Sequence, residues 1–350
     1  MTFAKRTVCP PQPAVLVTGA SSGIGKDCVR AFVAKGWHVF PVVRRPADVD
    51  SLRALCPSAA CLTPLLGSVT EEASMEEVVK KLTQCLAQGA AQGGAALRLQ
   101  AVVASAGMGA FAPLELSSLD LWREVFEVNV FAVASMSRLL LPLLRDAATS
   151  PGPAPRIIVV GSAAGRLPGP MQSTYCASKH AVEGLVDCMR MELRPHGVKV
   201  VLLQPGLVAT ALPARVEAAT EQQLRLVAPK LRAVYQNQME EMQAALRTML
   251  TKSIHVEEVV QVVEKAACAR SPSPRYAVGP GTKTAMWLRA RCSDTAWDRL
   301  TRWTGLRMAK MGRQLGQASP GGAAIQAPPP ATSSPAAAPA PVTASGLGSA

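Results

Sequence analysis

The sequence has few aromatic residues and no grouping of cysteine and histidine suited to a metal ion. Only 4% of the 350 residues are Phe, Trp or Tyr, and tyrosine occurs three times. The nine cysteines show no CxxC spacing and their number is odd, which favours free thiols in a reducing compartment. The four histidines, at positions 38, 180, 196 and 255, are scattered. We therefore expect no metal site.

Long hydrophobic runs are also missing. A spanning helix needs about 18 or more apolar residues without charge, and no such stretch occurs. The longest apolar segment, Val128–Leu144, is interrupted by Asn129 and Arg138 and is predicted to be a buried helix. Nothing near the start resembles a secretory signal. We expect a cytoplasmic protein.

The net charge of +13 is concentrated near the C-terminus. The segment Lys283–Arg313 holds eight Lys or Arg, two Asp, and the tryptophans 287, 297 and 303. It is either a solvated basic helix face or a peripheral contact with an anionic membrane surface. No nucleic-acid-binding motif occurs, so we expect no nucleic-acid partner. Residues 314–350 carry no charge, are rich in Ala and Pro, and are predicted to be a disordered tail.

Apolar strand-like runs alternate with helical segments over most of the chain. The predicted strands are 14–20, 38–43, 101–107, 156–162, 199–206 and 275–279, and the predicted helices include 26–35, 256–267 and one or two between 221 and 250. Strands that are apolar throughout are typical of a parallel sheet covered on both faces. The fold class is therefore α/β: a doubly wound, Rossmann-like parallel sheet with helices on both faces.

A glycine-rich stretch, TGASSGIG at Thr18–Gly25, lies between the first strand and the first helix. Its glycines allow a tight turn and close approach of a pyrophosphate to the helix N-terminus. The spacing is not GxGxxG, and a plain strand-to-helix turn is the alternative. The candidate cofactor-binding residues here are Gly19, Ser21, Ser22, Gly23, Ile24 and Gly25.

The end of the second strand indicates which dinucleotide is bound. Arg44 and Arg45 follow Val43, and no acidic residue occurs before Asp48. Arginine pairs with the 2′-phosphate of NADP, whereas NAD requires an acidic group for its ribose hydroxyls. We expect NADP(H), with NAD(H) as the second choice and Arg44 as the better candidate. Two ordinary surface arginines are the alternative.

These motifs, taken in order, resemble the short-chain dehydrogenase/reductase (SDR) family of single-domain type. The segments that carry the resemblance are TGASSGIG, ASAGMGAF (Ala104–Phe111), FEVNVFA (Phe126–Ala132), Ser162, YCASK (Tyr175–Lys179) and QPGLVAT (Gln204–Thr210). The resemblance implies residues 10–282 as a catalytic domain with a lid at about 211–252, followed by the 283–313 extension. It also implies homodimers or tetramers built from helices at 121–144 and 175–193.

Tyr175 is the only tyrosine with a lysine four residues later, which puts Lys179 on the same helix face. A phenol has a pKa near 10, and a neighbouring cation lowers it. The pair therefore suits a proton donor for carbonyl reduction, and a surface helix pair is the alternative. The resemblance implies that Lys179 also holds the cofactor ribose, that Ser162 binds the substrate oxygen, and that Asn129 holds a relay water.

The remaining expected contacts with the cofactor come from the same resemblance. They are Pro205, Gly206, Val208 and Thr210 around the nicotinamide, Ala106 and Gly107 after the fourth main strand, and Ser68 near the adenine. Three residues depart from the family pattern. Ala104 and Ser105 replace two asparagines, and Ser68 replaces an aspartate, which predicts a differently bonded adenine side.

A lid rich in Leu, Met, Val and Ala suits a lipophilic small-molecule substrate. The chain resembles the SDR branch that acts on steroids, retinoids and other lipophilic alcohols or ketones, so the predicted activity is interconversion of a carbonyl and an alcohol. A non-catalytic NADP(H)-binding sensor or scaffold is the alternative. An epimerase or dehydratase is disfavoured because GxxGxxG is absent.

Overall fold

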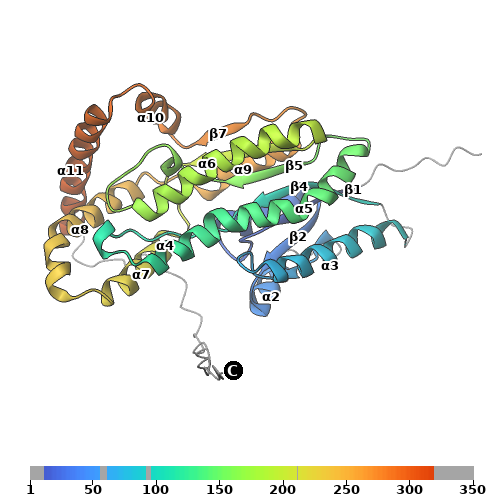
Figure 1. The fold of residues 1–350 in the computed structure, drawn as a ribbon, viewed down its shortest axis with the longest axis horizontal. Helices are drawn as coiled ribbons and strands as arrows, with labels where there is room; N and C mark the ends of the chain where they lie inside the picture. Colours follow the sequence, from blue (N-terminus) through green and yellow to red (C-terminus); the bar gives the residue numbers. More distant parts are fainter. Residues whose placement is uncertain (1–11, 56–60, 92–95, 211, 319–350) are drawn as a thin grey trace, which may run out of the picture.

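Seven parallel strands form one sheet in the order β3-β2-β1-β4-β5-β6-β7 (Figure 1). The computed structural model describes residues 12–55, 61–91, 96–210 and 212–318. The strands are β1 (Gln12–Val17), β2 (His38–Val43), β3 (Leu65–Leu66), β4 (Leu97–Ala104), β5 (Arg156–Val160), β6 (Lys199–Pro205) and β7 (Arg275–Val278). The order reverses direction between β1 and β4, where dinucleotide folds form their cleft.

Two helical layers cover the sheet, one on each face. One core joins the sheet to α1 (Gly23–Ala34), α2 (Pro46–Leu55) and α9 (Val256–Cys268). The other joins it to α3 (Glu72–Ala91), α5 (Ala132–Thr149) and α6 (Ser173–Leu193). Because both faces are covered, the central strands are buried along almost their whole length. The predicted α/β class with a Rossmann-like parallel sheet is confirmed.

A continuous helix crosses the second face. It begins as α4 (Leu119–Phe126), passes through a π-helical turn, η3 (Glu127–Phe131), and continues as α5. By length and composition it could cross a membrane, which the sequence analysis did not expect. Met136, Leu140 and Leu144 are nevertheless buried in the core beside the sheet. In this fold the helix over Val128–Leu144 therefore packs on the sheet, as the sequence predicted.

The segment after β6 forms a helical layer at one end of the molecule. It consists of α7 (Leu212–Arg225) and α8 (Pro229–Leu250), and residue 211 lies outside the described part. After β7 come α10 (Thr282–Arg289) and α11 (Asp294–Ala318). The boundary proposed at 313 therefore falls inside α11, and 319–350 lies outside the described residues.

Helices α8 and α11 pack against each other over much of their length (Figure 1). Thr248 donates to the Met308 carbonyl (2.8 Å), and Gly312 lies against the Ala244 backbone. Since the partner numbers run in opposite directions, the two helices are antiparallel. The basic extension is thus packed on the predicted lid.

Candidate active site

The predicted site residues lie at the carboxyl ends of neighbouring strands. The glycine loop follows β1, Arg44 and Arg45 follow β2, and Ser68 follows β3. Ala106 and Gly107 follow β4, Ser162 follows β5, and the segment from Pro205 to Thr210 follows β6. Because the strands are parallel, these ends meet at one edge of the sheet. Asn129, Tyr175 and Lys179 reach this edge from η3 and α6.

The glycine loop is closely packed and leaves the start of α1 free of a side-chain cap. Gly19 has φ +65°, and a Cβ there would lie 2.7 Å from the Ala106 nitrogen. A Cβ on Gly25 would lie 2.3 Å from the Gly19 carbonyl oxygen. Ser22, the N-cap residue, makes no side-chain hydrogen bond to the helix. The first N–H groups of α1 are thus not capped by Ser22, an arrangement that fits a pyrophosphate.

Thr18 anchors the loop where the family's two asparagines are missing. Its Oγ1 accepts hydrogen bonds from the backbone N–H of Ser105 (3.2 Å) and Ala106 (3.4 Å). The wall of the cleft beside Gly19 is therefore fixed from β1, with Ala104 and Ser105 in place. Sequence reasoning did not single out Thr18, although it is the first residue of the glycine motif.

The two arginines after β2 differ in their contacts. Arg45 forms a two-pronged pair with Asp48 (3.0 and 2.8 Å), and this pairing raises the pKa of its guanidinium. Within the described residues, Arg44 is exposed and makes no side-chain hydrogen bond or ion pair. Ser68 Oγ lies 3.0 Å from Thr70 Oγ1. Of the two arginines, Arg44 is the one whose guanidinium is available for a ligand.

Tyr175, Lys179 and Ser162 are brought together. Lys179 Nζ lies 5.8 Å from the centroid of the Tyr175 ring and donates to the Val160 carbonyl (3.3 Å). Ser162 is the polar side chain near the Tyr175 hydroxyl that acts to lower its pKa, and the Ser162 Oγ accepts from the Ala164 N–H (3.1 Å). A phenol, an ammonium and an alcohol therefore meet at the sheet edge.

The pKa of Tyr175 is shifted upward, whereas the sequence analysis expected it to be lowered. Part of the side chain stays accessible, yet the protein packed around the phenol raises its pKa above 10.0, and the hydrogen bond to Ser162 only partly opposes this. Burial also lowers the pKa of Lys179 to about 8. In the chain alone, desolvation is the largest cause of both shifts and Lys179 is not among the causes of the Tyr175 shift, so the predicted lowering of the Tyr175 pKa by Lys179 is wrong for this state.

Asn129 is held by its own hydrogen bonds. Its side chain donates to the Met108 carbonyl (2.9 Å) and to Ser178 Oγ (3.0 Å), and accepts from the Met108 N–H (3.0 Å). A Cβ on Gly107 would lie 3.4 Å from Asn129 Oδ1 and 3.8 Å from Lys179 Nζ. The π turn thus places Asn129 near Lys179, consistent with the frequent use of such turns at functional sites.

The segment after β6 bends back toward the glycine loop. Gly206 donates to the Val278 carbonyl (3.0 Å), and Ile254 pairs with Val208 and its neighbours. A Cβ on Gly23 would lie 3.4 Å from Thr210. Thr210 therefore faces the glycine loop, on the opposite side of the segment from the β7 end.

Helix α7, in the predicted lid, is hydrogen-bonded to the segment from Phe111 to Ser118, a feature that sequence reasoning missed. The Phe111 N–H donates to Thr220 Oγ1 (3.0 Å) on α7, and the Phe111 ring meets the Tyr175 ring edge-on at 6.1 Å. Gln223, also on α7, donates to the Leu116 carbonyl (3.0 Å) and accepts from Ser118 Oγ (3.0 Å). The three hydrogen bonds join residues more than 100 positions apart. The parallel sheet, together with the polar residues gathered at the carboxyl ends of its strands, is that of a Rossmann-type oxidoreductase.

Comparison with known proteins supports the assignment of a Rossmann-type oxidoreductase. A family model described as short chain dehydrogenase matches residues 13–221, more than half of the sequence. The chain belongs to the short-chain dehydrogenase family.

Its relatives and structural neighbours are moderately distant. The chain is 29% identical over 276 residues to the NADPH-dependent 3-dehydrocapnine reductase of Ornithobacterium rhinotracheale, covering 78% of this chain and 91% of that protein. It is 27% identical to the mitochondrial D-beta-hydroxybutyrate dehydrogenase of Mus musculus, covering 79% of each. A short chain dehydrogenase/reductase from Burkholderia phymatum, solved with NAD, superposes with TM-score 0.64 at 22% identity, covering 80% of this chain and 93% of that one. The structural likeness supports the shared fold.

Proposed function

We propose that this enzyme uses NADP(H) to interconvert a carbonyl and an alcohol on a lipophilic small molecule. The observation that carries the proposal is the grouping of Tyr175 with Lys179, whose Nζ lies 5.8 Å from the phenol ring, and with Ser162 beside the phenol. All three groups lie at the edge where the glycine loop opens toward α1. NADPH bound there would supply the hydride.

Each side chain has a distinct task in this proposal. Tyr175, whose raised pKa keeps the phenol protonated at neutral pH, donates the proton to the substrate oxygen. Ser162 donates a hydrogen bond to the same oxygen as negative charge develops. Lys179 holds a ribose hydroxyl, and its positive charge favours the phenolate that remains. Asn129 holds a water in a proton relay with Lys179, through which the Tyr175 phenolate regains its proton.

The remaining cofactor contacts follow from the same edge. Gly19 to Gly25 and the start of α1 hold the pyrophosphate, and Arg44 pairs with the 2′-phosphate, which favours NADP(H) over NAD(H). The segment from Pro205 to Thr210 lies along the nicotinamide. One relative, the 3-dehydrocapnine reductase, is by its name NADPH-dependent.

The apolar character of the lid supports a lipophilic substrate of steroid, retinoid or lipid-like kind. Leu212 on α7, Leu226 in the turn after it, and Val234 and Met249 on α8 are exposed. A pocket of about 180 Å³ lies next to the segment from Pro205 to Thr210. Its lining includes Leu207, Met249, Ile254 and Met308. Neither Tyr175 nor Ser162 lines it, so this pocket is separate from the proposed place of reaction.

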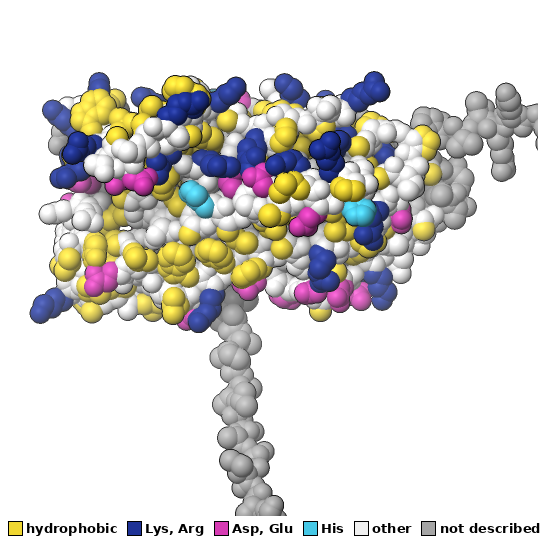
Figure 2. All heavy atoms as spheres, turned by 45° about the horizontal axis from the view of Figure 1, so that its top comes forward, with side chains coloured by type: hydrophobic (Ala, Val, Ile, Leu, Met, Phe, Trp, Pro, Cys, Tyr) yellow, Lys and Arg dark blue, Asp and Glu magenta, His cyan; other side chains and the backbone are white. Residues whose placement is uncertain are grey.

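The extension supports peripheral contact of a cytoplasmic protein with an anionic membrane. Trp287 and Trp303 are more than half exposed, and each lies beneath an arginine, Arg291 at 4.1 Å and Arg307 at 5.5 Å. Figure 2 shows hydrophobic and basic side chains together over the α10–α11 end of the molecule. Aromatic rings beside basic groups suit the interface between lipid headgroups and acyl chains.

A homodimer or tetramer is proposed through the helices α4–α5 and α6. Phe131 and Met191, on these helices, are 54% and 63% exposed. Light scattering at several concentrations tests this assembly.

The activity is tested by NADPH oxidation with a panel of hydrophobic ketones, aldehydes and quinones. Tyr175→Phe should lower turnover by about 10²- to 10⁴-fold, the usual contribution of a general acid, and should leave NADPH binding intact. Tyr276→Phe, the same change on β7, is the matched control. Cofactor binding without turnover on any compound would favour the sensor or scaffold instead.

A further inference from the structure

A cluster of charged side chains lies directly behind the predicted proton-transfer group. Tyr175, Lys179 and Glu183 are four residues apart on α6, so Glu183 continues the same helix face by one more turn. The Glu183 side chain is only 7% exposed. A carboxylate at such a site needs partners for its charge.

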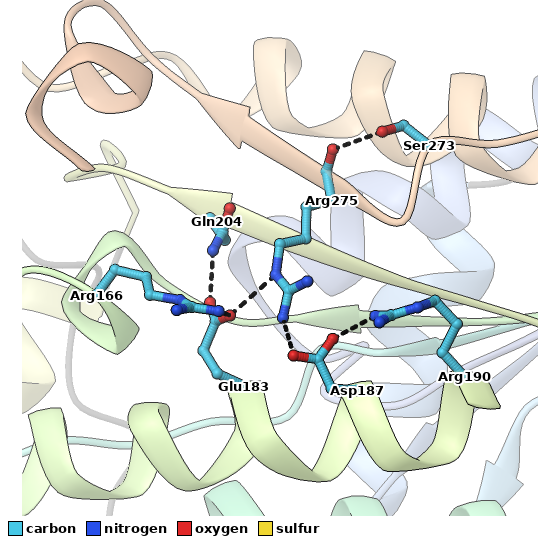
Figure 3. A network of polar contacts seen from close by, with 7 residues as sticks. All are labelled: Arg166, Glu183, Asp187, Arg190, Gln204, Ser273 and Arg275. Atoms are coloured by element: carbon cyan, nitrogen blue, oxygen red, sulfur yellow. Dashed lines mark hydrogen bonds and ion pairs between the residues drawn. The ribbon is translucent and has the colours of Figure 1, made fainter. Parts of the chain in front are cut away.

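Glu183 joins three elements that carry the site (Figure 3). Its Oε2 accepts from Arg166 Nε and from Arg275 Nε, both at 3.0 Å. Its Oε1 accepts from Gln204 Nε2 at 2.5 Å. Arg166 belongs to the turn that begins at Ser162, Arg275 belongs to the edge strand β7, and Gln204 precedes Pro205 at the end of β6.

The turn from Ser162 to Arg166 is short and packed onto α6. Ser162 caps the 3-10 turn η4 (Ala163–Gly165), and the Gly165 N–H donates to the Ser162 carbonyl (3.0 Å). A Cβ on Gly165 would lie 2.9 Å from the Lys179 carbonyl oxygen and 3.1 Å from Glu183 Cγ. The turn therefore seats between Lys179 and Glu183, with Ser162 at one end and the Arg166–Glu183 pair at the other.

We infer that Arg166 is a positioning residue, which acts through Glu183 to hold Ser162 at its distance from Tyr175. This inference rests on the function proposed above for Ser162. With the pair intact, the turn is held on α6 at both ends, and the Ser162 side chain keeps its place beside Tyr175. Displacing a reacting group by about 1 Å costs up to about 100-fold in rate.

Arg275 provides a matched comparison within the same cluster. It donates to the same Glu183 oxygen at the same distance, but it also pairs with Asp187 (2.6 Å) and belongs to β7. Its loss should therefore affect how β7 is held on α6 and should leave the Ser162 turn in place. If the cluster only stabilised the fold, substituting either arginine would have the same effect on kcat.

The experiment compares Arg166→Met and Arg275→Met, each alone and with Ser162→Ala, in the full chain. Arg166→Met should lower kcat by about 10- to 100-fold, with the KM for NADPH unchanged. In the Ser162→Ala background the same change should cost less than about threefold, because the two residues act on one interaction. Arg275→Met should lower the melting temperature while changing kcat by less than about threefold.

Two results would overturn the inference while leaving the proposed function standing. They are equal kcat losses in the two arginine variants, and an Arg166→Met loss that multiplies fully with that of Ser162→Ala. If Ser162→Ala itself leaves kcat unchanged, the proposed role of Ser162 is wrong and the positioning role falls with it. Arg166 is half exposed, so its methionine variant is expected to fold.

Discussion

Gly109 stands directly against the ring of Tyr175: a Cβ at this position would lie 2.9 Å from Tyr175 Cδ2. Gly109→Ala should push the ring away from Ser162 and lower kcat by about 10- to 100-fold. NADPH affinity, measured by fluorescence titration, should be unchanged. Gly184→Ala is the control, since nothing lies within 4 Å of its Cβ position. Equal activity of the two variants would contradict the assigned place of the phenol.

The contrast between the two arginines after β2 gives a prediction for cofactor choice. Arg44→Ala should raise the KM for NADPH by about 10- to 150-fold, because a charge-assisted hydrogen bond contributes about 1.5–3 kcal/mol. The KM for NADH should change little. Arg45→Ala removes a guanidinium already paired with Asp48 and should have the smaller effect. A larger loss from Arg45→Ala would reverse the assignment.

The buried ammonium of Lys179 predicts how stability depends on pH. Its pKa is about 8 in the folded chain and 10.5 ordinarily, so the unfolded chain binds more protons between these values. Below pH 8 the charged lysine costs the folded state about 3 kcal/mol, and this cost disappears as the pH rises to 10.5. Lys179→Met should therefore gain stability over wild type at pH 7, with a gap that closes toward pH 10.5 in urea titrations.

The exposed lysine at the start of β6 is the control for that measurement. Lys199→Met removes a lysine from the surface instead of the interior and is measured in the same urea titrations. A constant difference for Lys179→Met would mean that its ammonium is not desolvated.

The α8–α11 contact predicts a glycine effect far from the sheet edge. A Cβ on Gly312 would lie 1.8 Å from the Ala244 carbonyl oxygen, so Gly312→Ala should destabilise the fold by about 1–3 kcal/mol. Gly305→Ala, in the same helix with nothing within 4 Å, should be neutral or stabilising. Thermal unfolding of both variants measures this, and equal melting temperatures would show that the helices do not pack as described.

Membrane contact is best tested by point substitutions. Removing the extension would also uncover Ala244 and Ala245 on α8. Trp287→Ala with Trp303→Ala should reduce cosedimentation with phosphatidylserine vesicles, and added salt should weaken wild-type binding. Leu226→Ala, on the exposed lid surface, is the control. Unchanged cosedimentation of the double variant would exclude this surface as the contact.

The sheet could be predicted because parallel strands covered on both faces are apolar throughout, as in β5 and β6. Strand β3 was missed because two residues carry no pattern. The Tyr175–Lys179 spacing located the helix face, but the direction of the Tyr175 pKa depends on packing that spacing does not encode. The Phe111–Thr220 hydrogen bond and the Glu183 cluster each join segments far apart in the sequence, so no local sequence pattern predicts them.

The antiparallel pairing of α8 with α11 limits how a substrate can enter. Because Gly312 and Ala309 bring α11 against the α8 backbone, α8 cannot swing outward as a single flap. Opening must either carry both helices together or begin at α7, which is held by side-chain hydrogen bonds from Thr220 and Gln223 and by a small apolar contact through Ala219. We therefore expect α7, the short helix next to the Tyr175 phenol, to move when substrate enters, while α8 and α11 stay packed together.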